Sequence, residues 1–282
     1  MSSKKPIVAL IYDFDGTLSP GNMQEFGFIQ AIGKSPAEFW GDSDQIAIGQ
    51  DASNVLSYMK LMFDEAKKAG IKLRRKDFRR FGEQVELFDG VKGWFKLIND
   101  YGAEKGVIVE HYINSSGLAE MIEGTAIAHE FKRIFACSFL YDKNGEAEWP
   151  GVAVDYTAKT QFLFKINKGI LSIRDNKLVN ESQLDENKRI PFPNMIYFGD
   201  GDTDVPCMKI VKMFGGHSVA VYNPANEHKK ETARKLLRQE RVNFMTPANY
   251  RKDSRTYHLV CSIIDKIAAD CEIQRLSRFQ GR

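Results

Sequence analysis

The sequence feature that most constrains the fold is an apolar run that ends in two closely spaced acidic residues. Residues 6–12 are apolar and rich in β-branched side chains, which predicts a buried strand. The segment Asp13-Phe14-Asp15-Gly16-Thr17 follows directly. Burying two neighbouring carboxylates costs several kcal/mol unless a cation or a proton compensates them. The pair therefore predicts a reactive centre with a metal, or else a helix-capping Asp beside a solvated neighbour.

The rest of the chain alternates between strand and helix patterns, which predicts parallel βαβ units and a Rossmann-like α/β core. Further strands are predicted at residues 106–113, 134–140, 195–198, 218–222 and 242–245. Helices are predicted at residues 118–124, 159–168, 225–238 and 257–278. A helical pattern without strands interrupts this alternation directly after the first strand. We therefore predict an inserted α-helical domain at residues 19–96 and a catalytic core made of residues 1–18 and 97–282.

A second acidic group, Asp200, Asp202 and Asp204, follows a predicted strand and is interleaved with Gly199 and Gly201. Oxygen ligands in a loop at a strand end suit a hard cation such as Mg²⁺. An ordinary Asp-rich turn is the alternative; the calcium-loop pattern is missing. The carboxyl ends of parallel strands meet at one edge of a sheet, so we expect this group to lie near the first acidic pair.

Ser115 and Lys159 are single residues with two interpretations each. Ser115, followed by Ser116 and Gly117, comes after a predicted strand, where a hydroxyl and backbone N–H groups can bind an anion. Capping of a helix by Ser is the alternative. Lys159 begins a predicted helix, where its charge can neutralise a phosphate oxygen or a carboxylate. The alternative is an ordinary surface lysine.

The order Asp-x-Asp-Gly-Thr, Ser, Lys and Gly-Asp-Gly-x-x-Asp resembles the haloacid dehalogenase superfamily over nearly the whole chain. The inserted helical block resembles the cap of its phosphoserine-phosphatase-like branch. The resemblance implies that Asp13 is a nucleophile that forms an aspartyl-phosphate, and that Asp15 is the acid and base. Ser115 and Lys159 would hold the phosphate. Mg²⁺ would be bound by Asp13, the backbone carbonyl of Asp15, Asp200 and Asp204. The residues expected to contact phosphate or substrate are Gly16, Thr17, Ser116, Gly117, Asn22 and Glu25.

The resemblance implies a Mg²⁺-dependent phosphatase that acts on a small phosphorylated metabolite. Asp15 argues against a dehalogenase, which lacks the second Asp. A phosphomutase or phosphotransferase on the same core is the first alternative, and a non-catalytic binding protein is the second. Phosphoserine phosphatases usually carry a Glu nine residues after the nucleophile, where this chain has Asn22 and then Glu25 three residues further on. The neutral amide argues against phosphoserine as the substrate.

Composition excludes several other partners. The chain has 40 Lys and Arg against 37 Asp and Glu, a net charge of +3, which gives no support to nucleic-acid binding. It has no apolar run of roughly 20 residues, so no membrane span is predicted. The N-terminal residues do not resemble a signal peptide, and the four cysteines form no CxxC pair. These features predict a cytoplasmic protein and leave its oligomeric state open.

Overall fold

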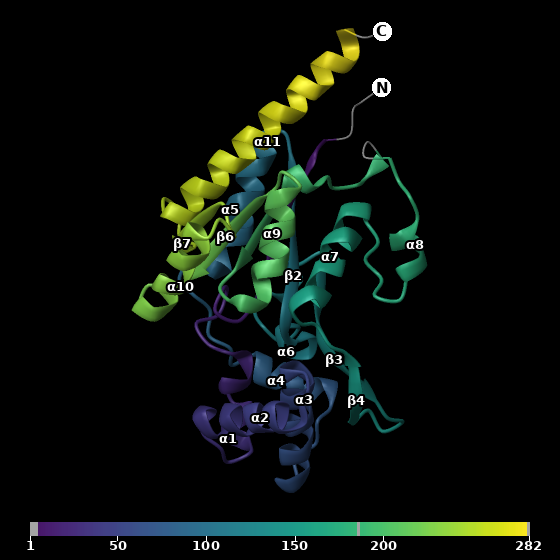
Figure 1. The fold of residues 1–282 in the computed structure, drawn as a ribbon, viewed down its shortest axis with the longest axis vertical. Helices are drawn as coiled ribbons and strands as arrows, with labels where there is room; N and C mark the ends of the chain where they lie inside the picture. The colour runs from purple at the N-terminus through teal and green to yellow at the C-terminus, as the bar shows by residue number, and fades with distance from the viewer. Residues whose placement is uncertain (1–4, 185–186, 281–282) are drawn as a thin grey trace.

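The computed structural model of the chain describes residues 5–184 and 187–280. In this part of the chain, seven strands form one sheet in the order β4-β3-β2-β1-β5-β6-β7 (Figure 1). All neighbouring strands are parallel except β3 and β4, which form an antiparallel hairpin at one edge. The predicted α/β fold is therefore confirmed. The strands are β1 (Ile7–Tyr12), β2 (Ile108–Leu118), β3 (Arg133–Tyr141), β4 (Ala147–Val152), β5 (Met195–Gly199), β6 (His217–Tyr222) and β7 (Phe244–Pro247).

Strand β1 lies in the middle of the sheet, between β2 and β5. Tyr12 at its end pairs with Ile113 of β2 and with Phe198 of β5. Residues 8–12 are fully buried, as expected for a central parallel strand covered on both faces. The residue that follows, Asp13, therefore emerges at the centre of the carboxyl edge of the sheet.

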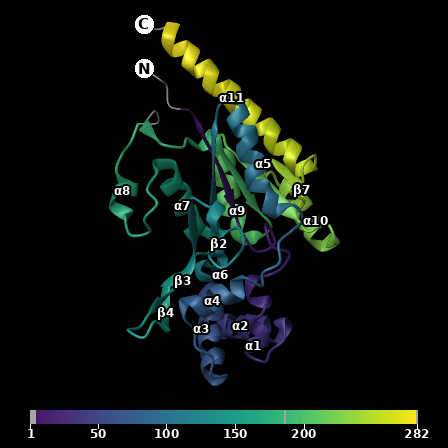
Figure 2. The same cartoon turned by 180° about the vertical axis from the view of Figure 1, so that it is seen from behind.

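Helices cover both faces of the sheet. Helices α7 and α9 pack together on one face, and α5 and α11 lie on the other (Figures 1 and 2). None of the described helices combines the length and the apolar character needed to cross a membrane. The helices of this part of the chain are α5 (Val91–Glu104), α6 (Ala119–Ile122), α7 (Tyr156–Lys168), α8 (Asn176–Asn180), α9 (Val205–Met213), α10 (Glu227–Arg238) and α11 (Arg255–Gln280).

The chain between β1 and β2 is helical throughout its regular structure, as the pattern predicted. Its first four helices gather beyond the carboxyl edge of the sheet, at the lower end in Figure 1. They are α1 (Phe28–Ala31), α2 (Pro36–Gln50), α3 (Asn54–Lys68) and α4 (Arg75–Gly82). The next helix, α5, packs on β2. The division into a cap at residues 19–96 and a core stays a prediction, and in space the group beyond the sheet consists of α1–α4.

The segment around Ser115 differs from the expectation. We predicted a strand that ends at residue 113 and a helix at 118–124, but β2 continues to Leu118 and α6 spans only Ala119–Ile122. The register between β2 and β3 shifts between Asn114 and Leu118, so this part of the strand is irregular. Because small polar residues favour turns, the sequence of this irregular strand end resembles a loop.

Candidate active site

A cavity of about 520 Å³ opens between the carboxyl edge of the sheet and the helices α2 and α3. The core contributes the acidic loop after β1, the end of β2 and the loop after β5. The inserted helices contribute polar and aromatic side chains. Its lining includes Asp13, Asp15, Gly16, Asn22, Glu25, Trp40, Tyr58, Ser115, Ser116, Gly117, Asp200 and Lys229.

Asp13 and Lys159 form an ion pair at the base of this cavity. The Lys159 Nζ lies 3.1 Å from Asp13 Oδ1 and 2.7 Å from Asp204 Oδ1, and the Lys159 side chain is fully buried. Burial alone would lower the pKa of Lys159, but attraction to the two carboxylates outweighs it and the pKa is raised. The lysine therefore remains charged. It lies inside α7, one turn after the helix begins at Tyr156, rather than at its first residue as predicted.

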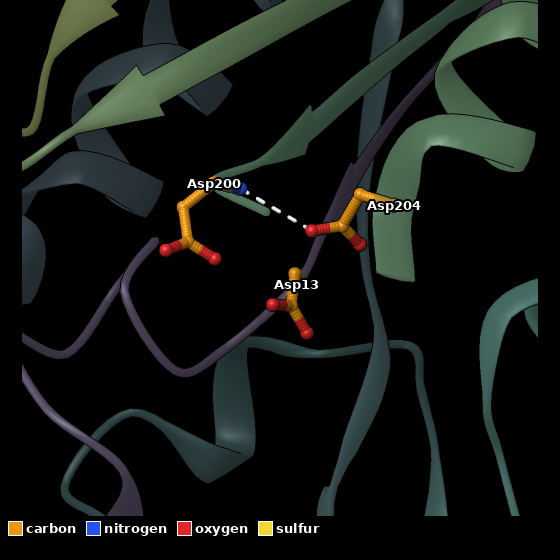
Figure 3. A group of neighbouring side chains, drawn as sticks. All are labelled: Asp13, Asp200 and Asp204. Atoms are coloured by element: carbon orange, nitrogen blue, oxygen red, sulfur yellow. Dashed lines mark hydrogen bonds between the residues drawn. The ribbon is translucent and has the colours of Figure 1, made fainter. Parts of the chain in front are cut away.

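Asp13, Asp200 and Asp204 converge from the ends of β1 and β5 (Figure 3). Each places a carboxylate oxygen within 4.8 Å of the others, and all three residues are buried. Asp204 is held in place: Oδ1 accepts a hydrogen bond from Tyr197 Oη at 2.8 Å, and Oδ2 accepts one from the Asp200 N–H at 3.2 Å. This oxygen-only, buried donor set fits a hard divalent cation such as Mg²⁺.

Gly16 lets the acidic loop after β1 approach the second acidic loop, which follows β5 and carries Asp200 and Asp204. Its φ is +73°, and a Cβ built on it would lie 2.2 Å from Asp200 Oδ2. Asp200 Oδ2 also accepts a hydrogen bond from Lys229 Nζ at 2.8 Å. A side chain at position 16 would therefore occupy the space that the Asp200 carboxylate fills.

Asp15 faces the cavity beside Asp13. Its Oδ1 accepts a hydrogen bond from the Met23 N–H at 2.9 Å. Burial, followed by the negative charge of Asp13, holds the pKa of Asp15 well above its usual value. Burial, followed by the charge of Asp204, raises the pKa of Asp13 to about 7 against the opposing effect of Lys159. The site therefore favours the protonated form of Asp15 more than an exposed position would.

Ser115, Ser116 and Gly117 line the cavity. Ser115 Oγ accepts a hydrogen bond from the Gly117 N–H at 3.0 Å, and the buried Ser116 Oγ has no hydrogen-bond partner in the described structure. A Cβ on Gly117 would lie 2.1 Å from Met23 Cε, so a larger residue there would require the Met23 side chain to move. An unpartnered buried hydroxyl at a cavity is a candidate contact for a bound oxyanion.

Asn22 and Glu25 also line the cavity, on the side of the inserted helices. Glu25 Oε1 accepts hydrogen bonds from Asn22 Nδ2 at 2.7 Å and from Trp40 Nε1 at 2.8 Å. These two bonds fix the Glu25 carboxylate beside the catalytic loop. Thr17, in contrast, is fully buried and does not line the cavity, so the structure separates it from the other predicted contacts.

Sequence reasoning missed three polar groups. Tyr197 lies inside β5 and resembles any buried strand residue. Tyr58 of α3 lines the cavity and donates a hydrogen bond to the backbone carbonyl of Ser116 at 2.7 Å. Lys229 is one of several cations in a charged helix. No local pattern marks these residues, because their roles arise only when distant elements meet.

The chain matches the model of a known protein family. The model of haloacid dehalogenase-like hydrolases matches residues 10–209. The chain belongs to this family. The matched region contains every predicted catalytic and metal-binding residue from Asp13 to Asp204, and it ends before α10 begins.

The individual proteins that resemble this chain share less than a third of its residues. An uncharacterized protein from Borreliella burgdorferi is 28% identical and covers 92% of this chain and 97% of its own. A HAD family hydrolase from Salmonella enterica serovar Typhi has a TM-score of 0.52 at 16% identity, and covers 80% of this chain; the match spans 66% of the Salmonella chain. A probable phosphoserine phosphatase from Vibrio cholerae, in its unliganded form, has a TM-score of 0.55 at 12% identity and covers 94% of this chain and 67% of its own. These similarities show a shared fold.

Proposed function

We propose that this hydrolase is a Mg²⁺-dependent phosphatase that cleaves a small phosphomonoester through an aspartyl-phosphate on Asp13. The observation that carries the proposal is the convergence of Asp13 with Lys159, Asp15 and the second acidic loop at one cavity. Family membership supports the hydrolase class, and the likeness to a probable phosphoserine phosphatase agrees with a phosphate ester as substrate.

Asp13 attacks phosphorus in the first step. An Asp13 oxygen forms the new P–O bond while the bond from phosphorus to the alcohol oxygen breaks. Lys159 holds Asp13 Oδ1 and so fixes the direction of the carboxylate. The hydroxyl groups of Ser115 and Ser116 offer hydrogen bonds to the phosphoryl oxygens. When bound, Mg²⁺ would be held by Asp13 and Asp200, with Asp204 positioned beside them, and it would neutralise phosphate charge.

Asp15 moves the protons. Its raised pKa favours the protonated form, which can donate to the leaving alcohol oxygen. The resulting carboxylate then accepts a proton from water as the water oxygen attacks the phosphorus of the aspartyl-phosphate. That step releases inorganic phosphate and restores both Asp13 and the proton on Asp15.

The inserted helices would select the substrate. Glu25, Asn22 and Trp40 face the same cavity as the catalytic loop, at the side where the leaving group would lie. A cavity of about 520 Å³ suits a small metabolite. The predicted cytoplasmic location remains a prediction.

The test compares Asp13→Asn with Asp202→Asn, using p-nitrophenyl phosphate with Mg²⁺ and with EDTA. An amide cannot attack phosphorus, so we expect Asp13→Asn to lose nearly all turnover. Asp202 is exposed in the same loop as Asp200, and its variant should stay active. Substantial phosphate release by Asp13→Asn, or full activity of the wild-type protein after chelation, would contradict the proposal.

A further inference from the structure

The second acidic loop, which follows β5, pairs with a lysine that does not belong to the family motifs. Lys229 of α10 places its Nζ 2.8 Å from Asp200 Oδ2 and lines the cavity. The Asp200 side chain is 11% exposed and that of Lys229 is 44% exposed. The ion pair therefore joins a nearly buried carboxylate to an ammonium group that solvent can still reach.

The position of Lys229 is unfavourable for a lysine in a helix. Asn226 caps α10, and its Oδ1 accepts a hydrogen bond from the Lys229 N–H at 3.1 Å, so Lys229 lies in the first turn. The start of a helix carries partial positive charge and disfavours cations. Attraction to Asp200 offsets this cost. The side chain is therefore held by the site rather than by its helix.

Each carboxylate of the group Asp13, Asp200 and Asp204 forms an ion pair with one of two lysines. Lys159 is fully buried and donates to both Asp13 and Asp204. Lys229 donates to Asp200. Lys159 is confined between two partners, whereas Lys229 has a single carboxylate partner in this group and a path to solvent. Only Lys229 can leave its carboxylate without being trapped in the interior as an unpaired charge.

We propose that Lys229 is an exchangeable counter-cation of Asp200, which neutralises this carboxylate when the metal is absent and competes with the metal for it. The inference rests on the metal site of the proposed function. It assigns Lys229 two effects: it keeps the metal-free site folded, and it weakens metal binding.

Direct metal titration tests the competition. Mg²⁺ binding is measured by calorimetry for the wild-type protein and for Lys229→Met. Removing a positive charge from the site of a divalent cation should tighten Mg²⁺ binding by about tenfold or more. Lys230→Met is the matched control, because Lys230 is on the same helix but pairs with Glu227 at 3.0 Å. Its variant loses the same charge and should bind Mg²⁺ as the wild type does.

Thermal unfolding supplies a second measurement that does not depend on turnover. In EDTA, Lys229→Met should have a lower Tm than the wild type, because Asp200 is left buried without its partner. Saturating Mg²⁺ should restore this loss, so the metal-induced rise in Tm should be larger in the variant. Lys229→Gln removes the charge but keeps a hydrogen-bond donor, and it should show the same direction of change if Lys229→Met does not fold.

The outcomes separate the two proposals. If the wild type binds Mg²⁺ and needs it for turnover, but the variants bind it equally or more weakly, Lys229 is not a competitor and only the inference is overturned. If the wild type does not bind Mg²⁺ at all, the metal-dependent function is wrong and the inference is overturned together with it. Tighter binding by Lys229→Met but not by Lys230→Met supports the inference.

Discussion

Gly16 shows how one missing side chain sets the geometry of the site. Its left-handed backbone turns the chain after Asp15, and the empty Cβ position lies 2.2 Å from Asp200 Oδ2. The loop after β1 and the loop after β5 therefore meet at the distance that a glycine allows. Any other residue would strain the backbone and displace the Asp200 carboxylate.

Gly16→Ala should lower kcat for phosphate-ester hydrolysis by about 100-fold or more while the protein stays folded. The left-handed conformation costs an alanine about 1 kcal/mol, which a domain of this size tolerates. The larger effect, on kcat, should come from displacement of the Asp200 carboxylate. Steady-state kinetics and a thermal melt measure the two effects separately.

Gly41→Ala is the control for this prediction. Gly41 lies within α2, and nothing lies within 4 Å of its Cβ position. Its substitution should leave kcat unchanged and raise Tm slightly, since alanine favours a helix. Normal kcat in Gly16→Ala would mean that Asp200 does not have to lie where the structure places it.

At the residue scale, the sequence predicted the groups that a motif fixes. Asp13, Asp15 and Asp200 follow strands at recognisable spacing, Ser115 lies at the irregular end of β2, and the structure brings all four to one cavity. Lys229 could not be predicted in the same way. Its contact with Asp200 depends on how the loops after β5 and β6 bring α10 to the carboxyl edge, and no local pattern encodes that placement.

At the scale of elements, a chain of buried hydrogen bonds joins β1, β2 and α5. Trp94 Nε1 donates to Tyr12 Oη at 2.8 Å, and Tyr12 Oη lies 3.1 Å from His111 Nδ1. His111 Nε2 lies 3.0 Å from Asn99 Oδ1, which can only accept a hydrogen bond. This pattern assigns the proton of a neutral imidazole to Nε2, with Tyr12 donating to Nδ1. Protonating Nδ1 would break the bond from Tyr12.

The free energy of unfolding should therefore fall in acid. Burial lowers the pKa of His111 from 6.5 to about 3, and the negative charge of Glu110 opposes this only in part. Between these values the unfolded chain binds a proton that the folded protein does not, so stability falls as the pH drops below 6.5. The slope from this residue is at most about 1.4 kcal/mol per pH unit.

Urea unfolding of the wild type and of His111→Gln, at about pH 7.5 and about pH 5, measures this contribution. The wild type should lose about 2 kcal/mol more than the variant between the two conditions. The difference between the proteins removes the contribution of other titrating groups such as His217. Equal losses would show that His111 is protonated in the folded protein.

Strands made of short apolar runs could be predicted from the sequence, but the end of β2 at the active site could not. Strands β1, β5 and β6 are short apolar runs, and the structure places them within one or two residues of the predicted bounds. Ser115, Ser116 and Gly117 line the cavity and are small, so their composition resembles a turn although they continue a strand. The residue types that suit a binding site are also those that favour turns, so the sequence does not reveal the strand here.

At the scale of the whole molecule, the inserted helices are fastened to the core by a backbone contact. A Cβ on Gly82 of α4 would lie 1.9 Å from the Met121 carbonyl oxygen, and one on Gly124 would lie 2.0 Å from the Arg79 carbonyl oxygen. Helices α4 and α6 therefore touch main chain to main chain. This contact fixes one side of the inserted group, while α2 and α3 lie over the cavity.

We expect the core to perform the reaction and the inserted segment to select the substrate. Variants of Glu25 and Asn22 test this expectation. Glu25→Ala and Asn22→Ala should lower kcat/KM for the physiological substrate by about tenfold or more, about 1.4 kcal/mol. Turnover of p-nitrophenyl phosphate should change little, because that ester lacks the contacted group. Lys159→Ala, in the core, should impair both substrates.

The substrate for this comparison comes from a screen of phosphorylated metabolites with the wild-type protein. Equal losses on both substrates in the Glu25 and Asn22 variants would show that these residues do not discriminate. The selecting surface would then lie elsewhere among the inserted helices.

The central position of β1 has a consequence for biosynthesis. β1 leaves the ribosome before one of its two neighbours, β5, which begins only at Met195. The nascent chain therefore carries an unpaired apolar strand edge while the residues between β1 and β5 are synthesised, and such an edge is prone to aggregation. Helices α2 and α3 are consecutive in the chain and pack on each other, so they can form earlier. The catalytic centre is completed only after β5 and the loop that carries Asp200 and Asp204 have been made.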